Sequence, residues 1–571
     1  MEKVWLGQYP KGIPAEANLS EFSSLKHVFE ESVRRFGELT AYSNMGGHLS
    51  YQQLDEASRH FGAYLQKSLQ LPKGARVAIM LPNLLQYPVA LFGALRAGYT
   101  VVNVNPQYTA RELEHQLTDS GAEAIVVLEN FAHTLQEVLQ KNKSLKLAVI
   151  TTEVGDMLPL MKELITNAVV KYVKKMVPEW RIADTIEFNA AVREGHSQTL
   201  DDVPLTHDDI AFLQYTGGTT GVAKGVVLTH GNMVANVQQM SLWVARDLDD
   251  GKEICVIPLP LYHVYALLAN LVFMKIGAHV VLITNPRDLP AFIAELKKQP
   301  FTGIIAVNTL YAALLDAPAF QDVDVRHLKM SSAGGMAVQR VVAEKWKRLT
   351  GVPIIEGYGL TETSPVAIAN PLDIKDWTGT IGVPIPSTEA TILDDDGEPV
   401  ALGDVGEICI RGPQVMKGYW NRPDETDKVF TDDGWLRTGD MGFMDERGYF
   451  KITDRKKDMI IVSGFKVFPN ELEDVISAHP GVREVAAIGV PDDKSGEVVK
   501  IFVVKRDESL TEAQLLDYCR KNLTGYKVPK FVEFRTEALP KSNIGKTLRR
   551  ELRNSSVQTP TVPVGAAGPT G

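Results

Sequence analysis

The spacing of hydrophobic and polar residues in the first third of the chain predicts alternating strands and helices. An apolar run over residues 76–81 is typical of a buried strand, and a helical pattern over 84–97 follows it, ended by Gly98. A second apolar run over 100–104 completes a strand–helix–strand unit. Strands that alternate with helices in this way form parallel sheets with helices on both faces, so an α/β layer structure is predicted.

The most apolar stretch, residues 264–283, is predicted to be a core helix and a buried strand rather than a membrane span. It carries Asn270, Lys275 and His279, which a spanning helix would have to bury in hydrocarbon. Gly277 supplies a helix stop between the two elements. The first twelve residues also lack the apolar run of a secretory signal.

Residues 160–177 combine helical spacing with positive charge. One helical face carries the apolar side chains of Met161, Ile165, Ala168, Val169, Tyr172 and Met176, and the lysines that flank or oppose it are Lys162, Lys171, Lys174 and Lys175. Such a basic amphipathic helix suits contact with an anionic membrane surface. An ordinary surface helix, packed on the body by its apolar face, explains the pattern equally well.

The second half of the chain changes character twice. Past Gly397, short strand-like runs between Gly and Pro turns predict a small β subdomain. The charged run DRKKD at 454–458 precedes a fresh α/β pattern, which places a domain boundary there. We therefore expect an N-terminal body over 1–454, a C-terminal domain over 455–554 and a disordered tail, rich in Pro, Gly and Thr, over 555–571.

Composition narrows the class of protein. The contents of 44% hydrophobic and 23% charged residues are those of a globular protein, and 571 residues exceed a single hydrophobic core. The formal net charge of -10 has the wrong sign for a protein that grips nucleic acid by its phosphates. Three scattered cysteines imply neither a disulfide framework nor a zinc cluster, so we expect a reducing, cytoplasmic location.

The segment YTGGTTGVAKG, residues 215–225, has the composition of a phosphate-binding loop. Its glycines allow tight turns that expose backbone N–H groups, its threonines add hydroxyl donors, and Lys224 adds a mobile positive charge. It is not a Walker A loop, because Ala223 and Gly225 flank the lysine where that motif needs Gly and Ser or Thr. A flexible linker would explain the glycines alone.

Five later blocks follow this loop in order. They are LPLYH (259–263), GYGLTETSP (357–365), GWLRTGD (434–440), DRKKDMIIVSGFKVFPNELE (454–473) and PKSNIGKTLRR (540–550). Together with the loop they resemble the signatures of the adenylate-forming superfamily of acyl-CoA synthetases, adenylation domains and luciferases. The resemblance covers nearly the whole chain up to about residue 554, and within the superfamily the likeness is to bacterial long-chain fatty acid–CoA ligases.

The resemblance implies a reaction and an architecture. A fatty acid, ATP and CoA would give acyl-CoA, AMP and pyrophosphate through an acyl-adenylate, with Mg²⁺ as cofactor. The fold would be a large body of parallel-sheet α/β subdomains with a small β subdomain, carrying a small mobile α+β C-terminal lid. A medium-chain acyl-CoA synthetase, a fatty acyl-AMP ligase and an inactive nucleotide-binding regulator remain alternatives, and the oligomeric state, a homodimer included, stays open.

The same resemblance assigns roles at the nucleotide. Glu362 would bind Mg²⁺ and Thr361 a phosphate oxygen, Tyr358 would lie along the adenine, and Asp440 would share the ribose with Arg455. The remaining residues expected to bind nucleotide or CoA are Thr216, Gly217, Gly218, Thr219, Thr220, Lys224, Gly335, Gly357, Gly359 and Gly464. Chemistry supports such a set, because activating a carboxylate with ATP brings two anions together and needs cations and N–H donors to offset their repulsion.

The catalytic cation and the acyl site complete the expectations. By resemblance, Lys546 would reach the carboxylate and the α-phosphate, and the lid would pivot at Lys457 to present Gly464 to the pantetheine thread. His263 is either a gate at the acyl pocket or a packed core histidine. The walls of an apolar acyl tunnel are expected from residues 264–274 and 304–315.

Overall fold

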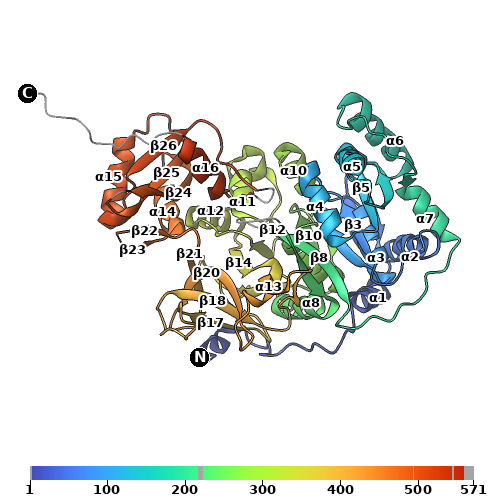
Figure 1. Cartoon of the computed structure of the whole chain (residues 1–571), viewed down its shortest axis with the longest axis horizontal. Helices are drawn as coiled ribbons and strands as arrows, with labels where there is room; N and C mark the ends of the chain where they lie inside the picture. Colours follow the sequence, from blue (N-terminus) through green and yellow to red (C-terminus); the bar gives the residue numbers. More distant parts are fainter. Residues whose placement is uncertain (1–2, 217–222, 464, 493, 543–544, 559–571) are drawn as a thin grey trace, which may run out of the picture.

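The computed structural model describes residues 3–216, 223–463, 465–492, 494–542 and 545–558, with the side chains of 556–558 left out (Figure 1). Two large sheets, mostly parallel, form the N-terminal body. The first has the order β19 (Gly418–Tyr419), β9 (Lys224–Thr229), β8 (Ile210–Thr216), β4 (Thr100–Asn103), β3 (Arg76–Met80), β5 (Ala124–Leu128), β6 (Ala148–Thr152), β7 (Ile186–Glu187). The predicted strands at 76–81 and 100–104 are therefore confirmed as the parallel pair β3 and β4.

The second sheet continues the α/β pattern. Its order is β16 (Val383–Pro384), β15 (Val366–Ala369), β14 (Ile354–Gly359), β13 (Met330–Ala333), β12 (Gly303–Ala306), β10 (Ile254–Ile257), β11 (His279–Leu282), β1 (Thr40–Asn44), β2 (Gly47–Ser50). The strands from β14 to β1 pair in parallel, and the edge strands turn antiparallel. The carboxyl end of β14 therefore carries Tyr358 to one edge of this layer.

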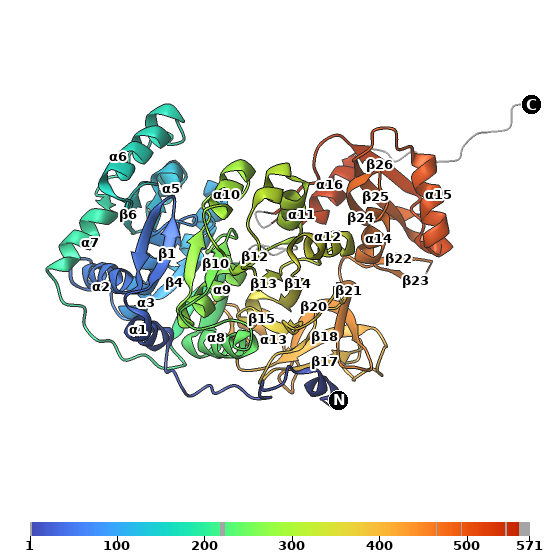
Figure 2. The ribbon, with the colours of Figure 1, turned by 180° about the vertical axis from the view of Figure 1, so that it is seen from behind.

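Helices cover the two sheets and fill the space between them (Figures 1 and 2). They are α1 (Leu25–Phe36), α2 (Tyr51–Lys67), α3 (Gln86–Arg96), α4 (Ala110–Ser120), α5 (Glu129–Lys141), α6 (Leu160–Ala168), α7 (Phe188–His196), α8 (His230–Val244), α9 (Val264–Lys275), α10 (Leu289–Leu296), α11 (Asn308–Asp316) and α12 (Arg340–Thr350). One core joins α3, α8 and α9 to strand residues of both sheets, for example Val77 and Ile257.

The apolar stretch over 264–283 forms the elements that the sequence predicts. Helix α9 ends at Lys275, Gly277 adopts a φ of 73°, and β11 follows at His279. In the part of the chain that the structure describes, no helix combines the length and the apolar character needed to cross a bilayer.

A third, antiparallel sheet forms the small β subdomain. Its order is β17 (Glu389–Leu393), β18 (Gly406–Arg411), β20 (Leu436–Met444), β21 (Phe450–Arg455), and the short α13 (Pro423–Asp427) lies between β18 and β20 in sequence. The subdomain begins earlier than the sequence predicts. Gly397, with a φ of 89°, lies in the connection between β17 and β18 rather than before the first strand, so β17 was missed.

The chain leaves this sheet at Arg455 and enters another at Ile460. The last sheet contains β22 (Ile460–Val462), β23 (Phe465–Val467), β24 (Val482–Asp492), β25 (Gly496–Lys505) and β26 (Phe531–Arg535), with helices α14 (Pro469–Ser477), α15 (Glu512–Asn522) and α16 (Arg549–Gln558). This α+β unit lies beside α11 and α12 in both ribbon views (Figures 1 and 2). The expected fold class, an α/β body with a smaller C-terminal domain, is confirmed.

Candidate active site

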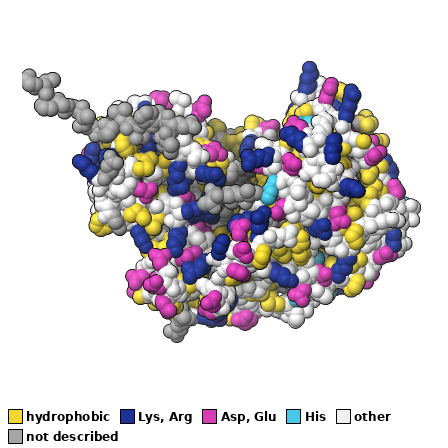
Figure 3. Space-filling model, in the orientation of Figure 1, with side chains coloured by type: hydrophobic (Ala, Val, Ile, Leu, Met, Phe, Trp, Pro, Cys, Tyr) yellow, Lys and Arg dark blue, Asp and Glu magenta, His cyan; other side chains and the backbone are white. Residues whose placement is uncertain are grey.

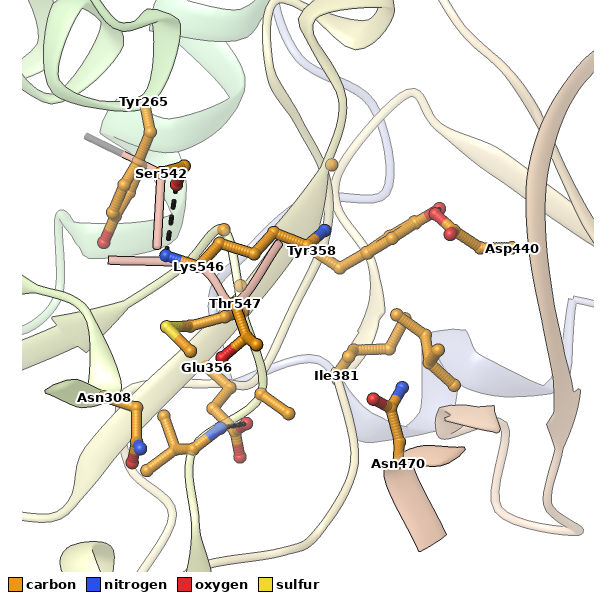
Figure 4. Close-up of a pocket in the computed structure, with 18 of the residues that line it drawn as sticks. Tyr265, Asn308, Glu356, Tyr358, Ile381, Asp440, Asn470, Ser542, Lys546 and Thr547 are labelled. Atoms are coloured by element: carbon orange, nitrogen blue, oxygen red, sulfur yellow. Dashed lines mark hydrogen bonds between the residues drawn. The ribbon is translucent and has the colours of Figure 1, made fainter. Parts of the chain in front are cut away.

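A cavity of about 2090 Å³ lies where the body, the β subdomain and the C-terminal unit meet. Its lining includes Tyr358 of β14, Asp440 of β20 and Lys546 of the C-terminal unit, together with Thr361 and Glu362. Figure 4 shows the Lys546 side chain extending towards Tyr358 and Asp440 from the opposite side. Residues separated by almost two hundred positions in the sequence thus face one space.

Asp440 is one of the buried acidic side chains that line this cavity. Its side chain accepts a hydrogen bond from the Tyr358 hydroxyl at 2.7 Å and forms an ion pair with Arg455 at 3.1 Å, while the residue is only 4% exposed. Strands β20 and β21 pair Asp440 directly with Arg455, so the sheet register holds the ion pair. A carboxylate has about four acceptor positions, so capacity remains for two further hydroxyl donors.

Lys546 approaches on a tight loop of the C-terminal unit. Its backbone N–H donates to the Ser542 hydroxyl at 3.1 Å, and its carbonyl accepts from the Ser542 N–H at 2.7 Å. Burial lowers the pKa of Lys546 to about 8, and the Arg455 charge acts in the same direction while Asp440 opposes it. The neighbouring Gly545 has a φ of 84°, and a Cβ there would lie 2.5 Å from the Thr309 hydroxyl of α11. The loop therefore needs a glycine where it meets the body.

Glu362 lies on a short 3-10 turn, Thr361–Thr363, after β14. Its carboxylate accepts a hydrogen bond from the Tyr419 hydroxyl at 2.8 Å. The Lys224 ammonium lies 4.8 Å from the centre of the Tyr419 ring and pairs with Glu425. Tyr419 therefore links the glycine-rich segment to Glu362, a role that the sequence analysis missed.

The loop that was expected to hold phosphates is described only at its ends. Thr216 and Lys224 are opposite each other in the β8–β9 pair, and Thr216 lines the cavity. Gly217, Gly218, Thr219 and Thr220 lie outside the described residues, as does Gly464. The expectations for these five residues stay predictions.

The three other glycines differ in what requires them. Gly335 has a φ of 78°, in the left-handed region that favours glycine. A Cβ on Gly359 would lie 1.7 Å from the Pro365 carbonyl oxygen, so the strand itself demands this glycine. A Cβ on Gly357 would meet no protein atom closer than 3.9 Å, so packing within the chain does not require a glycine there. Its position in the cavity lining is the remaining reason for it.

His263 caps α9 and also lines the cavity. Its Nδ1 accepts a hydrogen bond from the Tyr265 N–H at 3.4 Å, and burial lowers its pKa to about 4. The neutral ring is therefore packed in place and borders the cavity, so features of both earlier interpretations are present. Whether it gates access stays a prediction.

The expected acyl walls are only partly where the sequence put them. Of residues 264–274, only Val264 and Tyr265 line the cavity, because the rest of α9 is packed into the core. Residues 304–315 contribute Asn308, Thr309, Ala312, Ala313 and Leu315. The apolar lining that the sequence analysis missed comes from Met240, Trp243 and Val244 of α8, with Met330 and Met336.

Glu356 is another buried carboxyl group of the cavity. Glu356 of β14 is 8% exposed and accepts a hydrogen bond from the Val338 N–H at 2.9 Å. Burial raises the pKa of Glu356 to about 7. Figure 4 shows it close to Asn308 and away from Asp440, so the two carboxyls occupy different ends of the space.

The link between body and C-terminal unit is a turn over 456–458. Lys457 is exposed there and borders the cavity, while Lys456 forms an ion pair with Asp395 of the β subdomain at 2.7 Å. Across the link, Arg549 of α16 pairs with Asp454 of β21 at 3.2 Å. The Lys456–Asp395 pair is exposed, and exposed ion pairs contribute little to stability. The Arg549–Asp454 pair is buried, so a rearrangement that separated these two residues would have to break a buried ion pair.

Family models and related proteins match both the body and the C-terminal unit of this chain. The model for AMP-binding enzymes matches residues 29–420, and the model for the AMP-binding enzyme C-terminal domain matches 471–546. A long-chain-fatty-acid–CoA ligase of Escherichia coli O157:H7 is 56% identical over 557 residues, which cover 97% of this chain and 99% of the relative.

Solved structures share the whole architecture. The anthranilate CoA ligase AuaEII in complex with anthranoyl-AMP has a TM-score of 0.83 at 25% identity, covering 95% of this chain and 99% of that one. ATP-bound MatB from Rhodopseudomonas palustris has a TM-score of 0.78 at 27% identity, covering 93% and 99%. Both matches cover more than nine tenths of this chain.

Proposed function

We infer that this chain, which belongs to the AMP-binding enzyme family, is a long-chain fatty acid–CoA ligase that forms AMP. It joins a fatty carboxylate to CoA through an acyl-adenylate. The observation that carries this conclusion is the meeting of Lys546 with Tyr358 and Asp440 in one cavity, in a chain that matches named ligases over nearly its full length. A nucleotide site and a delivered cation are the two parts that carboxylate activation requires.

In the first half-reaction a carboxylate oxygen of the fatty acid attacks the α-phosphorus of ATP. The bond between that phosphorus and the bridging oxygen breaks, and pyrophosphate leaves. We assign Asp440 to the ribose hydroxyls, and Arg455 holds the Asp440 carboxylate in place. We assign Tyr358 to the adenine face. We assign Lys546 to the oxygens between carboxylate and α-phosphate, where negative charge builds up, and its location beside Asp440 supports this role.

In the second half-reaction the CoA sulfur attacks the acyl carbonyl. The bond from that carbon to the phosphate oxygen breaks, AMP leaves, and the thiol proton passes to solvent. Lys546 fills part of the cavity in the described arrangement, so we expect the C-terminal domain, residues 455–554, to turn about Lys457 and withdraw it. Gly464 would then admit the pantetheine thread. The exposed ion pair of Lys456 with Asp395 at the link is consistent with such a pivot.

Mg²⁺ suits the residues present. In the described part of the chain, no group of three or more His, Cys, Asp or Glu side chains could hold a metal ion by itself. Mg²⁺ in nucleotide sites commonly takes one carboxylate and fills its other positions with phosphate oxygens and water, and Glu362 supplies that carboxylate beside the Thr361 hydroxyl. When bound, the ion would neutralise charge on the leaving pyrophosphate.

We place the acyl chain in the apolar part of the cavity along α8. Asn236 of α8 bonds to Val366 of β15, and one to two turns further on Met240 and Trp243 line the cavity. Trp243 is 1% exposed, its Nε1 donates to the Asn370 carbonyl at 3.1 Å, and Tyr9 packs on its ring. We take this fixed ring as the floor that limits chain length.

We place the enzyme in the cytoplasm, in peripheral contact with the membrane that dissolves its substrate. All three cysteines are free and buried, as in proteins of a reducing compartment.

Purified protein tests the reaction directly. With palmitate, ATP and Mg²⁺, addition of CoA should yield the thioester and AMP in equal amounts. Adenylate that accumulates and ignores free CoA would instead identify a fatty acyl-AMP ligase, and absence of both products would identify an inactive nucleotide-binding protein. A substrate series from octanoate to oleate separates the long-chain from the medium-chain enzyme.

A further inference from the structure

Helix α6 and the π-helical turn that continues it, Val169–Val173, carry an exposed apolar face. This face consists of Leu160, Met161, Leu164, Ile165, Tyr172, Val173 and, just beyond, Met176, which are between 55% and 73% exposed. They are seven of the sixteen large apolar side chains that the described residues expose. Scattered apolar side chains on a surface need no explanation, but a cluster on one helix does.

The helix is attached to the body by its polar side. Asn167 accepts a hydrogen bond from the Gly155 N–H at 2.6 Å, and Lys171 forms ion pairs with Glu129 at 3.2 Å and Glu153 at 3.5 Å. Neither α6 nor the π-helical turn contains a buried residue. The helix is therefore inverted relative to an ordinary surface helix, which buries its apolar stripe. The sequence alternative of a helix packed by its apolar face is wrong.

Charge beside the exposed apolar face selects the kind of partner. Lys174 and Lys175 are exposed at its carboxyl end, on a chain whose formal net charge is -10. The Lys162 ammonium, near the start of the helix, instead donates to the Gly46 carbonyl of the body at 3.0 Å. Figure 3 shows basic side chains at the tip of the projection formed by α6, with hydrophobic ones beside them. A helix with apolar residues outward and lysines at its margins has the composition of segments that lie in the interface of anionic membranes.

We propose that the exposed apolar face, together with Lys174 and Lys175, is a docking surface that inserts into the headgroup region of an anionic lipid bilayer. The proposal rests on the peripheral membrane contact of the proposed function and names the surface that makes it. It gives the enzyme a place where a substrate dissolved in lipid is concentrated. Each apolar side chain that enters the bilayer leaves water, and each lysine meets lipid phosphate.

A second copy of the chain fits this surface less well. At about 1.5 Å per residue the two helical segments form a rod only about 20 Å long, whereas a standard interface buries roughly 800 Å² on each partner. A bilayer needs only a narrow convex ridge, which is what α6 presents.

The position of α6 leaves the catalytic motion free. In both ribbon views α6 projects from the end of the molecule opposite the C-terminal unit (Figures 1 and 2). A protein docked through α6 therefore keeps the turn over 456–458 and the loop of Lys546 away from the membrane. Docking and rotation of the lid do not compete for the same surface.

Flotation of the full-length protein with vesicles tests the proposal. Vesicles of phosphatidylethanolamine and phosphatidylglycerol are compared with neutral phosphatidylcholine vesicles. The variant Leu164→Gln/Ile165→Gln should lower the partition coefficient on anionic vesicles by about tenfold or more. The matched control Leu402→Gln/Val405→Gln changes apolar side chains that are 49% and 39% exposed elsewhere, and it should bind like the wild type. Turnover of octanoate dissolved in buffer should be equal in all three.

A fluorescent reporter gives an independent measurement. In Tyr172→Trp, brominated lipids in anionic vesicles should quench the new indole, and quenching should weaken as salt is raised. Vesicle binding by the glutamine variant at wild-type strength would overturn the proposal, as would equal binding to neutral and anionic vesicles. Absence of quenching would overturn it even if the double variant proved unstable. A wild-type dimer that the double variant converts to monomer, without vesicle binding, would show that a second copy covers the face.

Discussion

Formation of the adenylate should depend on pH through Lys546. Burial and the Arg455 charge lower the pKa of this lysine to about 8. Only the protonated side chain can offset the charge between carboxylate and α-phosphate, so kcat/KM for ATP should be level below pH 8 and fall about tenfold per pH unit above it. This fall above pH 8, the alkaline limb of the profile, reports the pKa of Lys546 in the free enzyme, because bound ATP stabilises the Lys546 cation and raises that pKa.

Two substitutions fix the size and the origin of the effect. An ammonium about 4 Å from a unit negative charge, at an effective dielectric constant of about 20, contributes roughly 4 kcal/mol. Lys546→Ala should therefore slow adenylation about a thousandfold. Lys546→Arg retains a charge that does not titrate in this range, so its profile should lose the alkaline limb, although its absolute rate falls because guanidinium geometry differs.

The assay is exchange of labelled pyrophosphate into ATP with palmitate present and CoA absent. This isolates the first half-reaction, so titration of the CoA thiol cannot contribute. Conversion of supplied palmitoyl-AMP and CoA to thioester should be nearly unchanged in Lys546→Ala. A wild-type profile that stays level well above pH 8, or an alkaline limb that persists in Lys546→Arg, would refute the assignment of the limb to Lys546.

Three further substitutions test the rest of the cavity. Tyr419→Phe removes the hydroxyl that donates to Glu362, and a hydrogen bond to a charged group contributes about 1.5–3 kcal/mol. The Mg²⁺ concentration for half-maximal pyrophosphate exchange should therefore rise about tenfold or more. An unchanged Mg²⁺ requirement would show that Glu362 does not bind the metal. Asp440→Asn should raise the KM for ATP by about tenfold or more with a smaller effect on kcat, in steady-state measurements with palmitate. Met240→Trp should shorten the apolar end of the cavity by about four methylenes, and each buried methylene contributes about 0.8 kcal/mol. The kcat/KM for palmitate should fall about a hundredfold, while that for octanoate should stay unchanged. Equal losses with both acids would show that the acyl chain does not lie beside Met240.

Local signals predicted much of the body because they act over a few residues. The apolar runs at 76–81 and 100–104 became β3 and β4, and the glycine stop at Gly277 separates α9 from β11. Such signals depend on backbone conformation and on burial of a neighbouring strand. The start of the β subdomain was misplaced for a related reason: Gly397 is a turn glycine, and a turn glycine does not tell whether the strand before it belongs to the same sheet.

The parts of the site that sequence could not supply depend on pairing over long distances. Tyr419 reaches Glu362 because β19 pairs with β9, and nothing near Tyr419 in the sequence announces that pairing. Met240 and Trp243 were missed because α8 is apolar or buried on nearly every side, so its pattern does not reveal which face borders a cavity. The motif resemblance identified the charged residues and the glycines of the site. The apolar lining, and the side chains that hold those residues in place, could be identified only from the three-dimensional structure.

Helix α6 shows why a pattern can be right about an element and silent about its orientation. Helical periodicity sorted its side chains correctly into an apolar and a polar face, but either face can dock if the body offers the matching surface. Here the body offers Glu129, Glu153 and the loop at Gly155, so the polar face is satisfied by charge and hydrogen bonds. An apolar face exposed to water costs free energy, and that cost is removed only when an apolar surface covers the face. The proposed membrane contact therefore explains why this segment directs its apolar side chains outward.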